Sequence, residues 1–278
     1  MANYTAADIK ALRERTGAGM MDVKKALDEA NGDTEKAMEV IRIKGLKGAT
    51  KREGRSTAEG LIAARVNDGA GVMIEVNCET DFVAKSAPFI EFGDKVVTAA
   101  VDSGAADVDA LLGYDVDGKP LSEHVIEAGA LLGEKVKVRR IARVEGRTVD
   151  AYLHKTSKDL PAQVGVLFAV DGEGSDAEEA AHDVAVHAAA YNPTYITRDE
   201  VPAELVENER RIADETARAE GKPEQALTKI VEGRLTGFFK EGVLLDQAFA
   251  KDPKKSVAQV LQEAGVSATG LARFRVGS

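Results

Sequence analysis

The fold class is decided by residues 60–76, GLIAARVNDGAGVMIEV, in which two apolar segments flank a short polar turn. The segments Gly60–Val66 and Val72–Val76 are rich in aliphatic and β-branched residues, which favours strands. Asn67-Asp68-Gly69-Ala70 lies between them, and an Asp-Gly pair is typical of a tight turn between antiparallel strands. We therefore predict a β-hairpin here, within an antiparallel sheet.

The hairpin runs on into Cys78-Glu79-Thr80-Asp81-Phe82-Val83-Ala84-Lys85, where the pattern changes from strand to helix. Thr80 is a suitable helix N-cap, and Asp81 suits the first turn, where the helix dipole favours negative charge. Two interpretations are open for the residues that follow. Composition favours Phe82 and Val83 folded onto the core, because large apolar residues mostly lie inside. Alternatively, the corner presents the ring and the carboxylate outward, as a wedge that enters a partner's pocket.

The rest of the chain predicts helices and strands in groups, without regular βαβ alternation, and this pattern indicates the α+β class. Helices are expected at 87–102, 121–132, 177–191 and 257–263, and strands at 136–144, 150–154, 163–171 and 270–276. Residues 201–242 predict a charged helical hairpin that is broken at Gly221-Lys222-Pro223. The expected divisions are an N-terminal module with a basic linker (1–55), one core half (56–145), a second core half (146–200 and 243–278) and the hairpin (201–242).

Residues 5–45 predict three short helices. Thr5 and Asp8 form a capping pair, Gly17 closes the first helix, and Asn31-Gly32 separates the second from the third. Residues 46–57 are rich in Lys, Arg and Gly. We interpret them as a linker or as an extension of the third helix.

Met20 and Met21 open the second helix, and adjacent helical side chains point about 100° apart. In so small a bundle, full burial of both is hard to achieve, and an exposed Met makes an adaptable apolar contact. Arg13 and Lys24 are placed to rim such a patch. The alternative, left equally open, is that both Met side chains fill the edges of a wide core stripe.

Composition describes an ordinary globular protein with an uneven charge. The net charge is −10, which argues against nucleic acid as a direct partner, since phosphate binding needs a clustered basic excess. Residues 1–55 carry 12 Lys and Arg against nine Asp and Glu, whereas the remainder carries 25 against 38. The N-terminus lacks a signal-peptide pattern, and no apolar run approaches the ~20 residues that span a bilayer. With one cysteine, Cys78, the chain is expected in the reducing cytoplasm and off the membrane.

The sequence offers no convincing catalytic or cofactor-binding motif. A Walker A loop does not occur, and acidic neighbours oppose pyrophosphate binding at Gly172-x-Gly174-x-x-Ala177. His182 and His187 are five residues apart, which is not the spacing of two metal ligands on one helix face. Cys78 follows an apolar strand, which favours a buried structural thiol over a nucleophile. We therefore expect no enzyme activity, no bound metal and no cofactor.

Two long motifs resemble one family. Leu12–Leu27, LRERTGAGMMDVKKAL, followed by Asn31-Gly32-Asp33, is similar to the N-terminal module of bacterial elongation factor Ts. Glu75–Lys85, EVNCETDFVAK, is similar to that family's central signature, and Val231–Arg234 and Arg273–Val276 also match it. The likeness covers nearly the whole chain, with the motifs in the family's order.

The resemblance implies the guanine nucleotide exchange factor of elongation factor Tu, the GTPase that carries aminoacyl-tRNA. It implies a ubiquitin-associated-like three-helix module, a core of two related halves, and a hairpin that is a possible homodimer contact. Thr80, Asp81, Phe82 and Val83 would enter the GTPase near its Mg²⁺ site, with Asp81 and Phe82 as the wedge. Further contacts would come from Arg13, Met20, Met21, Lys24 and His154. Some members continue into a C-terminal helix that contacts the GTPase, whereas this sequence stops at Ser278.

Two other function classes remain as alternatives. A structural adaptor with the same modules would bind the GTPase without releasing GDP. A small-molecule enzyme would have a pocket lined by titrating groups. An exchange factor would speed GDP release when present in catalytic amounts.

Overall fold

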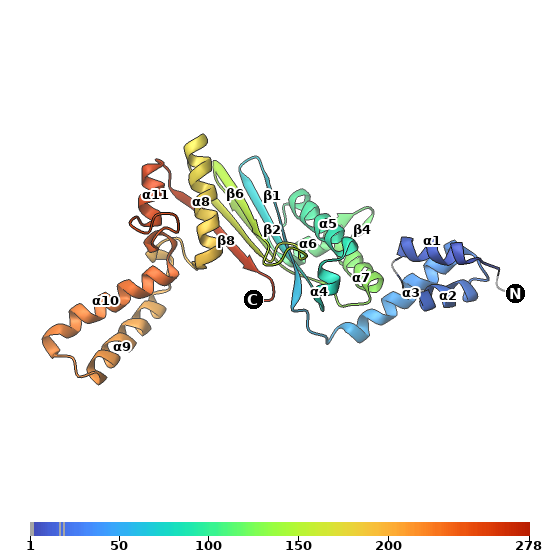
Figure 1. Ribbon diagram of the computed structural model, residues 1–278, viewed down its shortest axis with the longest axis horizontal. Helices are drawn as coiled ribbons and strands as arrows, with labels where there is room; N and C mark the ends of the chain where they lie inside the picture. The colour runs from blue at the N-terminus through green and yellow to red at the C-terminus, as the bar shows by residue number, and fades with distance from the viewer. Residues whose placement is uncertain (1–2, 17, 19) are drawn as a thin grey trace.

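The computed structural model describes residues 3–16, 18 and 20–278, which form helices at the N-terminal end, two three-stranded antiparallel sheets and a helical hairpin. Figure 1 shows the N-terminal helices at one end of the elongated molecule and the hairpin at the other, with the sheets between them. Helices and antiparallel strands occur in separate groups, so the predicted α+β class is confirmed.

The N-terminal helices are α1 (Ala6–Thr16), α2 (Met20–Glu29) and α3 (Thr34–Arg52). Their shared core consists of small and aliphatic side chains: Leu12, Val23, Ala26, Leu27, Ala30 and Ala37. The predicted capping pair is confirmed, because Asp8 Oδ2 accepts from Thr5 N at 2.7 Å and Thr5 Oγ1 accepts from Asp8 N at 3.2 Å. Gly17, where α1 is expected to close, lies outside the described residues.

The turn after α2 and the length of α3 settle the remaining N-terminal predictions. Asn31 and Gly32 have positive φ, which takes the chain out of α2 and into α3 as predicted. Since α3 runs to Arg52, the first part of the basic segment is a helix extension, and residues 53–58 form the connection to the first sheet.

The predicted hairpin is confirmed as β1 (Glu59–Asn67) and β2 (Ala70–Cys78), with Asn67 opposite Ala70. Asp68 and Gly69 have φ of 45° and 78°, the left-handed pair of a type I′ turn, whose twist matches that of the strands. Strand β5 (Lys137–Glu145) pairs with the other edge of β2 and completes the sheet order β1-β2-β5.

Helices cover the outer face of this first sheet. They are α4 (Asp81–Ala84), α5 (Ala87–Ser103), α6 (Val108–Gly113) and α7 (Leu121–Leu132), with the small hairpin β3 (Asp115–Val116) and β4 (Lys119–Pro120) before α7. Leu61, Ile74 and Val76 point from the sheet towards this layer and pack with Phe89 and Leu121. Their alternation along the strands is that of a sheet with one face towards a helix layer.

The second sheet consists of β6 (Thr148–His154), β7 (Val164–Val170) and β8 (Ala268–Arg275), in the order β6-β7-β8. Val166 and Phe168 point outward to α8 (Ser175–Tyr191) and α11 (Val257–Glu263). Leu167 points the opposite way and packs with Ile62 and Met73 of the first sheet. The core therefore has layers in the order helix, sheet, sheet, helix.

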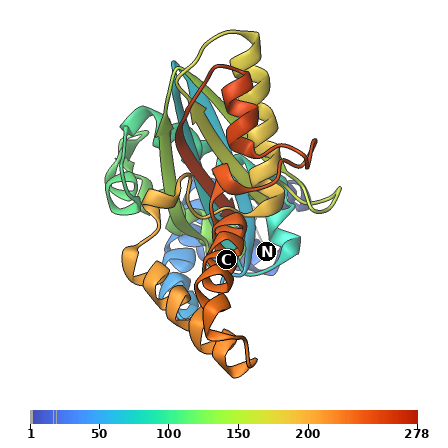
Figure 2. The same ribbon diagram turned by 90° about the vertical axis from the view of Figure 1, so that its left-hand side faces the viewer.

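The predicted helical hairpin consists of α9 (Ala203–Ala219) and α10 (Glu224–Gly242), separated at the expected Gly-Lys-Pro break. Ala213, Val231 and Leu235 pack between the helices, and Arg210 pairs with Glu232 across them at 2.5 Å. Short helices η1 (Arg198–Glu200) and η2 (Leu244–Asp246) lie at its base. In Figure 2 the orange hairpin projects away from the sheets.

A buried carboxylate ties the end of the chain to β2. Glu75 is fully buried, and it accepts hydrogen bonds from Arg140 Nε at 2.6 Å and from the main-chain N–H of Gly277 at 3.0 Å. Arg140 also donates to the carbonyl of Arg275 and stacks on Phe274. These contacts compensate the charge of the carboxylate, which would otherwise be costly in the interior.

In the described part of the chain, no helix combines the length and apolarity needed to cross a membrane. Among the same residues, no group of His, Cys, Asp and Glu side chains has the arrangement of a metal site.

Candidate partner-docking site

The corner between β2 and α4 presents Phe82 to solvent. Thr80 is the N-cap of α4, as predicted, and its Oγ1 accepts from Val83 N at 3.4 Å. Phe82 is 73% exposed, whereas Val83 packs against the core and Ala84 is buried. The placement of Phe82 in the core, which composition favours, is therefore wrong. We call Thr80, Asp81, Phe82 and Val83 the wedge.

The exposed side chains of the wedge are grouped around one lysine. Lys85 lies four residues after Asp81, on the same helical face, and its Nζ is 3.5 Å from Asp81 Oδ2. The same Nζ lies over the Phe82 ring, 4.5 Å from its centroid. The corner thus combines an aromatic face, a carboxylate and an ammonium group within one turn of chain.

The wedge is hydrogen-bonded to Glu134, which follows the C-terminal end of α7. Sequence reasoning missed this contact. Glu134 Oε2 accepts from the main-chain N–H groups of Glu79 and Thr80, at 2.9 and 3.0 Å, and its Oε1 accepts from Thr80 Oγ1 at 2.6 Å. No local sequence signal marks Glu134, because its partners lie more than fifty residues earlier in the chain.

Cys78 lies beneath the corner as the predicted buried thiol. Its side chain is fully buried, and its Sγ donates to the carbonyl of Thr80 at 3.3 Å. Burial, together with the smaller effect of the nearby charges of Glu134 and Glu59, raises the pKa of the Cys78 thiol to about 12. The thiol is therefore protonated at neutral pH and poorly suited to act as a nucleophile.

The N-terminal residues named from the sequence form a second exposed surface. Met20 and Met21 are 58% and 62% exposed, so they do not fill the edges of the core. Lys24 lies one turn further along α2 and is exposed, as is Arg13 on α1. Val23 and Leu27 occupy the buried face of α2 in their place. We call Arg13, Met20, Met21 and Lys24 the N-terminal patch.

His154 lies apart from both surfaces, at the end of β6 in the second sheet. Its ring is exposed, and Tyr152 Oη lies 3.2 Å from its Nδ1. The two rings are 6.1 Å apart between centroids. The structure thus keeps the wedge, the N-terminal patch and His154 on separate elements.

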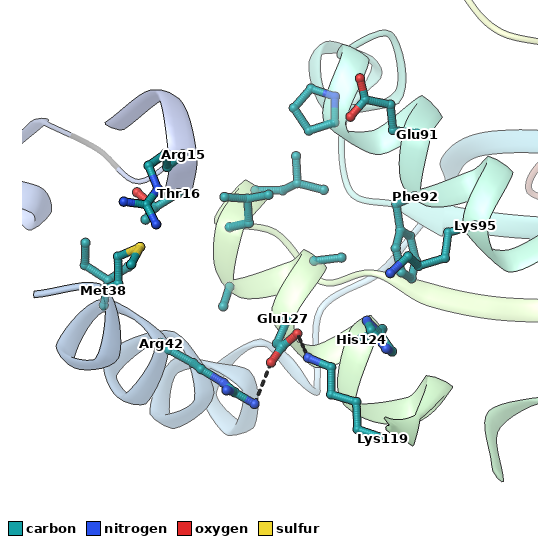
Figure 3. Close-up of a pocket in the computed structure, with 16 residues that line it drawn as sticks. Arg15, Thr16, Met38, Arg42, Glu91, Phe92, Lys95, Lys119, His124 and Glu127 are labelled. Carbon is teal, nitrogen blue, oxygen red and sulfur yellow. Dashed lines mark hydrogen bonds and ion pairs between the residues drawn. The ribbon is translucent and has the colours of Figure 1, made fainter. Parts of the chain in front are cut away.

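A groove of about 570 Å³ lies between the N-terminal helices and the core, as Figure 3 shows. Met38 and Phe92 give it an apolar lining, and Arg15 and Lys95 stand at its edges. Glu127 lies within it and pairs with Arg42 at 2.7 Å and with Lys119.

Several titratable groups of the groove already have partners within the protein. Besides the pairs of Glu127, His124 Nε2 is held 2.8 Å from the carbonyl oxygen of Val116. Groups with such partners hold the walls together, so the groove does not favour the small-molecule enzyme.

Comparison with known proteins identifies the family. The family model described as elongation factor TS matches residues 79–278. Curated proteins named elongation factor Ts are similar over the full length of both chains, with 80% identity in Renibacterium salmoninarum, 78% in Paenarthrobacter aurescens and 55% in Kineococcus radiotolerans. A family-model match over most of the chain, together with full-length relatives at these identities, means that this chain belongs to the elongation factor Ts family.

Proposed function

We propose that this chain is the guanine nucleotide exchange factor of elongation factor Tu and acts by docking, without covalent chemistry. Its family supports the exchange role. The observation that carries the mechanism is Phe82, held 73% exposed beside Asp81 on the first turn of α4. Covering an apolar ring of this size with a partner is favourable in free energy, which supports a role for the exposed ring in binding.

In this mechanism, Asp81 and Phe82 enter between helices of the GTPase near its Mg²⁺ site. The ion offsets phosphate charge and helps to hold GDP. A wedge that binds better to a distorted, magnesium-poor pocket lowers the affinity for GDP, and by linkage GDP lowers the affinity for the wedge equally. The exchange factor then leaves when GTP and Mg²⁺ restore the pocket.

The energy required makes the wedge insufficient alone. Loosening GDP by about 10⁴-fold needs a differential of about 5.5 kcal/mol. Complete burial of a Phe side chain supplies about 1.5–3 kcal/mol. We therefore propose that the N-terminal patch and His154 supply the remaining contacts and hold the wedge against its target.

The test measures release of a fluorescent GDP analogue from elongation factor Tu in the presence of catalytic amounts of this protein. Wild type is expected to speed release, and Phe82→Ala and Asp81→Ala to lose most of that effect. Asp109→Ala is a matched control, because Asp109 is an exposed carboxylate in the first turn of another short helix, α6.

The outcomes separate the alternatives. Tight binding by wild type without faster release would favour the adaptor and contradict the exchange role. Full activity in both wedge variants would leave the exchange role standing and remove the wedge from it.

We also propose, from family resemblance, that the hairpin of α9 and α10 is a homodimer contact. Its exposed Ile212 is surrounded by ion pairs such as Arg211 with Glu215 at 2.9 Å. Sedimentation velocity of wild type and Ile212→Asp is the test: a dimer that the substitution does not weaken would place the contact elsewhere.

A further inference from the structure

The wedge is too short to hold its own shape. Helix α4 has four residues, whereas an isolated helix needs about 12–15 residues to be even marginally stable in water. Its geometry must therefore be imposed from outside. On the inner side, Ala84 is buried in the first core and Val83 packs against it. On the other side, the entrance to the helix is bound by Glu134.

Both carboxylate oxygens of Glu134 accept hydrogen bonds from the residues just before α4. One oxygen receives the main-chain N–H groups of Glu79 and Thr80, and the other receives the Thr80 hydroxyl. Hydrogen bonds to a carboxylate are charge-assisted and stronger than bonds between neutral groups. They fix the main chain immediately before Asp81, and thereby set the direction in which α4 starts.

The attachment is reciprocal. While Glu134 binds the main chain of residues 79 and 80, Glu79 Oε1 accepts from the main-chain N–H of Lys135 at 2.6 Å. Two carboxylates thus exchange main-chain donors across the same gap, one from each segment. Arg55 also donates to Glu79, at 3.3 Å, and Lys135 Nζ donates to the carbonyl of Glu53. The connection that follows α3 is therefore bonded to the same pair of segments, residues 79–80 and 134–135.

The structure places Glu134 through the end of α7. Gly133 has a φ of 74°, a left-handed conformation that turns the chain sharply out of the helix. Helix α7 itself packs against α3, and its Glu127 pairs with Arg42 of that helix. Figure 1 shows α7 beside α4, on the side towards the N-terminal helices. Glu134 thus joins the wedge to a rigid element that also contacts the N-terminal module.

We propose that Glu134 is a positioning residue for nucleotide exchange, which aims Asp81 and Phe82 by binding the main chain at Glu79 and Thr80. The proposal rests on the exchange function proposed above. Glu134 acts through the wedge and need not touch the GTPase. Its loss should leave the N-terminal patch and His154 intact, so initial docking persists while the wedge enters its target less often.

The experiment measures GDP release from elongation factor Tu over a range of exchange-factor concentrations, which separates the plateau rate from the half-saturating concentration. Glu134→Ala is expected to lower the plateau about tenfold, equivalent to about 1.4 kcal/mol, and to change the half-saturating concentration less than about twofold. Glu134→Gln should keep the plateau within about threefold of wild type, because its amide can still bind the two N–H groups and the hydroxyl. Glu123→Ala is the control, because it removes an exposed carboxylate from the first turn of α7.

A double variant distinguishes positioning from general destabilisation. If Glu134 acts through the wedge, Glu134→Ala should cause a smaller further loss of plateau rate in a Phe82→Ala background than it causes in wild type. Should Glu134→Ala melt below the assay temperature, Glu134→Asp replaces it, because it keeps the charge but is one methylene shorter and should lower the plateau.

The failures of the two proposals are distinct. Wild type without effect on GDP release would overturn the exchange function itself. An active wild type and an impaired Phe82→Ala, together with a wild-type plateau for Glu134→Ala or with additive losses in the double variant, would overturn the role of Glu134.

Discussion

Phe82 and Val83 are adjacent, yet the structure gives them opposite surroundings. Val83 packs on the first core, while Phe82 remains 73% exposed. Leaving a Phe side chain in water forgoes about 1.5–3 kcal/mol of burial energy in the free protein. That energy is available when a partner covers the ring. Lys85 over one face of the ring shields part of it in the meantime.

At this scale we predict a pH dependence of stability from Cys78. Burial raises its thiol pKa from 9.0 to about 12, so the folded state holds a proton that the unfolded chain releases. The stabilisation is complete below pH 9 and is lost as pH rises towards 12. Between pH 8 and 10 wild type should lose about 1.4 kcal/mol relative to Cys78→Ala, measured by urea unfolding.

The comparison with Cys78→Ala removes the titration of lysines and tyrosines that both proteins share. Parallel pH profiles of the two proteins would show that the thiol has an ordinary pKa in the folded state.

The sequence was informative about single residues where the chemistry is local. The Thr80 cap, the Thr5 and Asp8 pair and the buried Cys78 follow from neighbours in the chain, and the structure confirms them. The exposure of Phe82 depends on which face of a four-residue helix meets the core, and pattern alone favoured the wrong face. Glu134 could not be predicted, because long-range pairing of a carboxylate with main-chain groups leaves no spacing to detect.

At the scale of elements, the turn between β1 and β2 gives a prediction about Gly69. Its φ is 78°, and a Cβ there would lie 2.7 Å from the carbonyl oxygen of Gly146. Gly69→Ala should therefore destabilise by roughly 2 kcal/mol or more, from left-handed strain together with the clash. Thermal or urea unfolding measures the loss.

Gly118 provides the matched control. It has a similar φ of 84° in the turn between β3 and β4, but no atom lies within 4 Å of the position of its Cβ. Gly118→Ala should cost about 1 kcal/mol from strain alone. Equal losses at both positions would show that the contact with Gly146 adds nothing.

Helix α2 gives a second prediction, because its exposed and buried faces are sharply different. Met20→Ala combined with Met21→Ala should raise the half-saturating concentration for GDP release roughly tenfold, since two large apolar contacts are lost, and should change the plateau rate little. The measurement is the concentration series described for Glu134. Ile43→Ala, which truncates an exposed apolar side chain on α3, should behave like wild type.

A fall in plateau rate without a change in half-saturation would contradict the docking role of the patch.

The helices and strands themselves were largely predictable, because turn residues such as Asp68-Gly69 and Asn31-Gly32 mark their ends. Which helix packs on which sheet was not, since both sheets present aliphatic residues on both faces.

For the whole molecule, the layered core separates the three surfaces that we propose to contact elongation factor Tu. The wedge belongs to the helices outside the first sheet, and His154 belongs to the second sheet. The N-terminal patch belongs to α1 and α2, at the end of the molecule (Figure 1). One partner must therefore be large enough to meet several of these surfaces together. A globular protein partner meets this requirement, whereas a small ligand does not.

The stability of the two-sheet core should depend on Arg140. Its removal leaves the fully buried Glu75 without its cation, and breaking a buried pair in this way costs about 3–5 kcal/mol. Arg140→Ala should therefore lower the free energy of unfolding by about 3 kcal/mol or more, measured by urea denaturation. Arg147→Ala breaks an exposed pair with Glu173 and should cost less than about 1 kcal/mol. Similar losses in the two variants would contradict the compensation of Glu75 by Arg140.

The same carboxylate links the protein's biosynthesis to its folding. A chain emerges from the ribosome N-terminus first, and β2 is exposed long before the residues that complete its surroundings exist. Arg140 appears with β5, but Gly277 is synthesised 202 residues after Glu75, and the carbonyl of Arg275 appears only shortly before it. The first sheet can collapse on its helices during translation. Because Gly277 completes the surroundings of Glu75, we expect the layer between the sheets to close around this carboxylate only after residue 277 has been synthesised, later than the collapse of the first sheet on its helices.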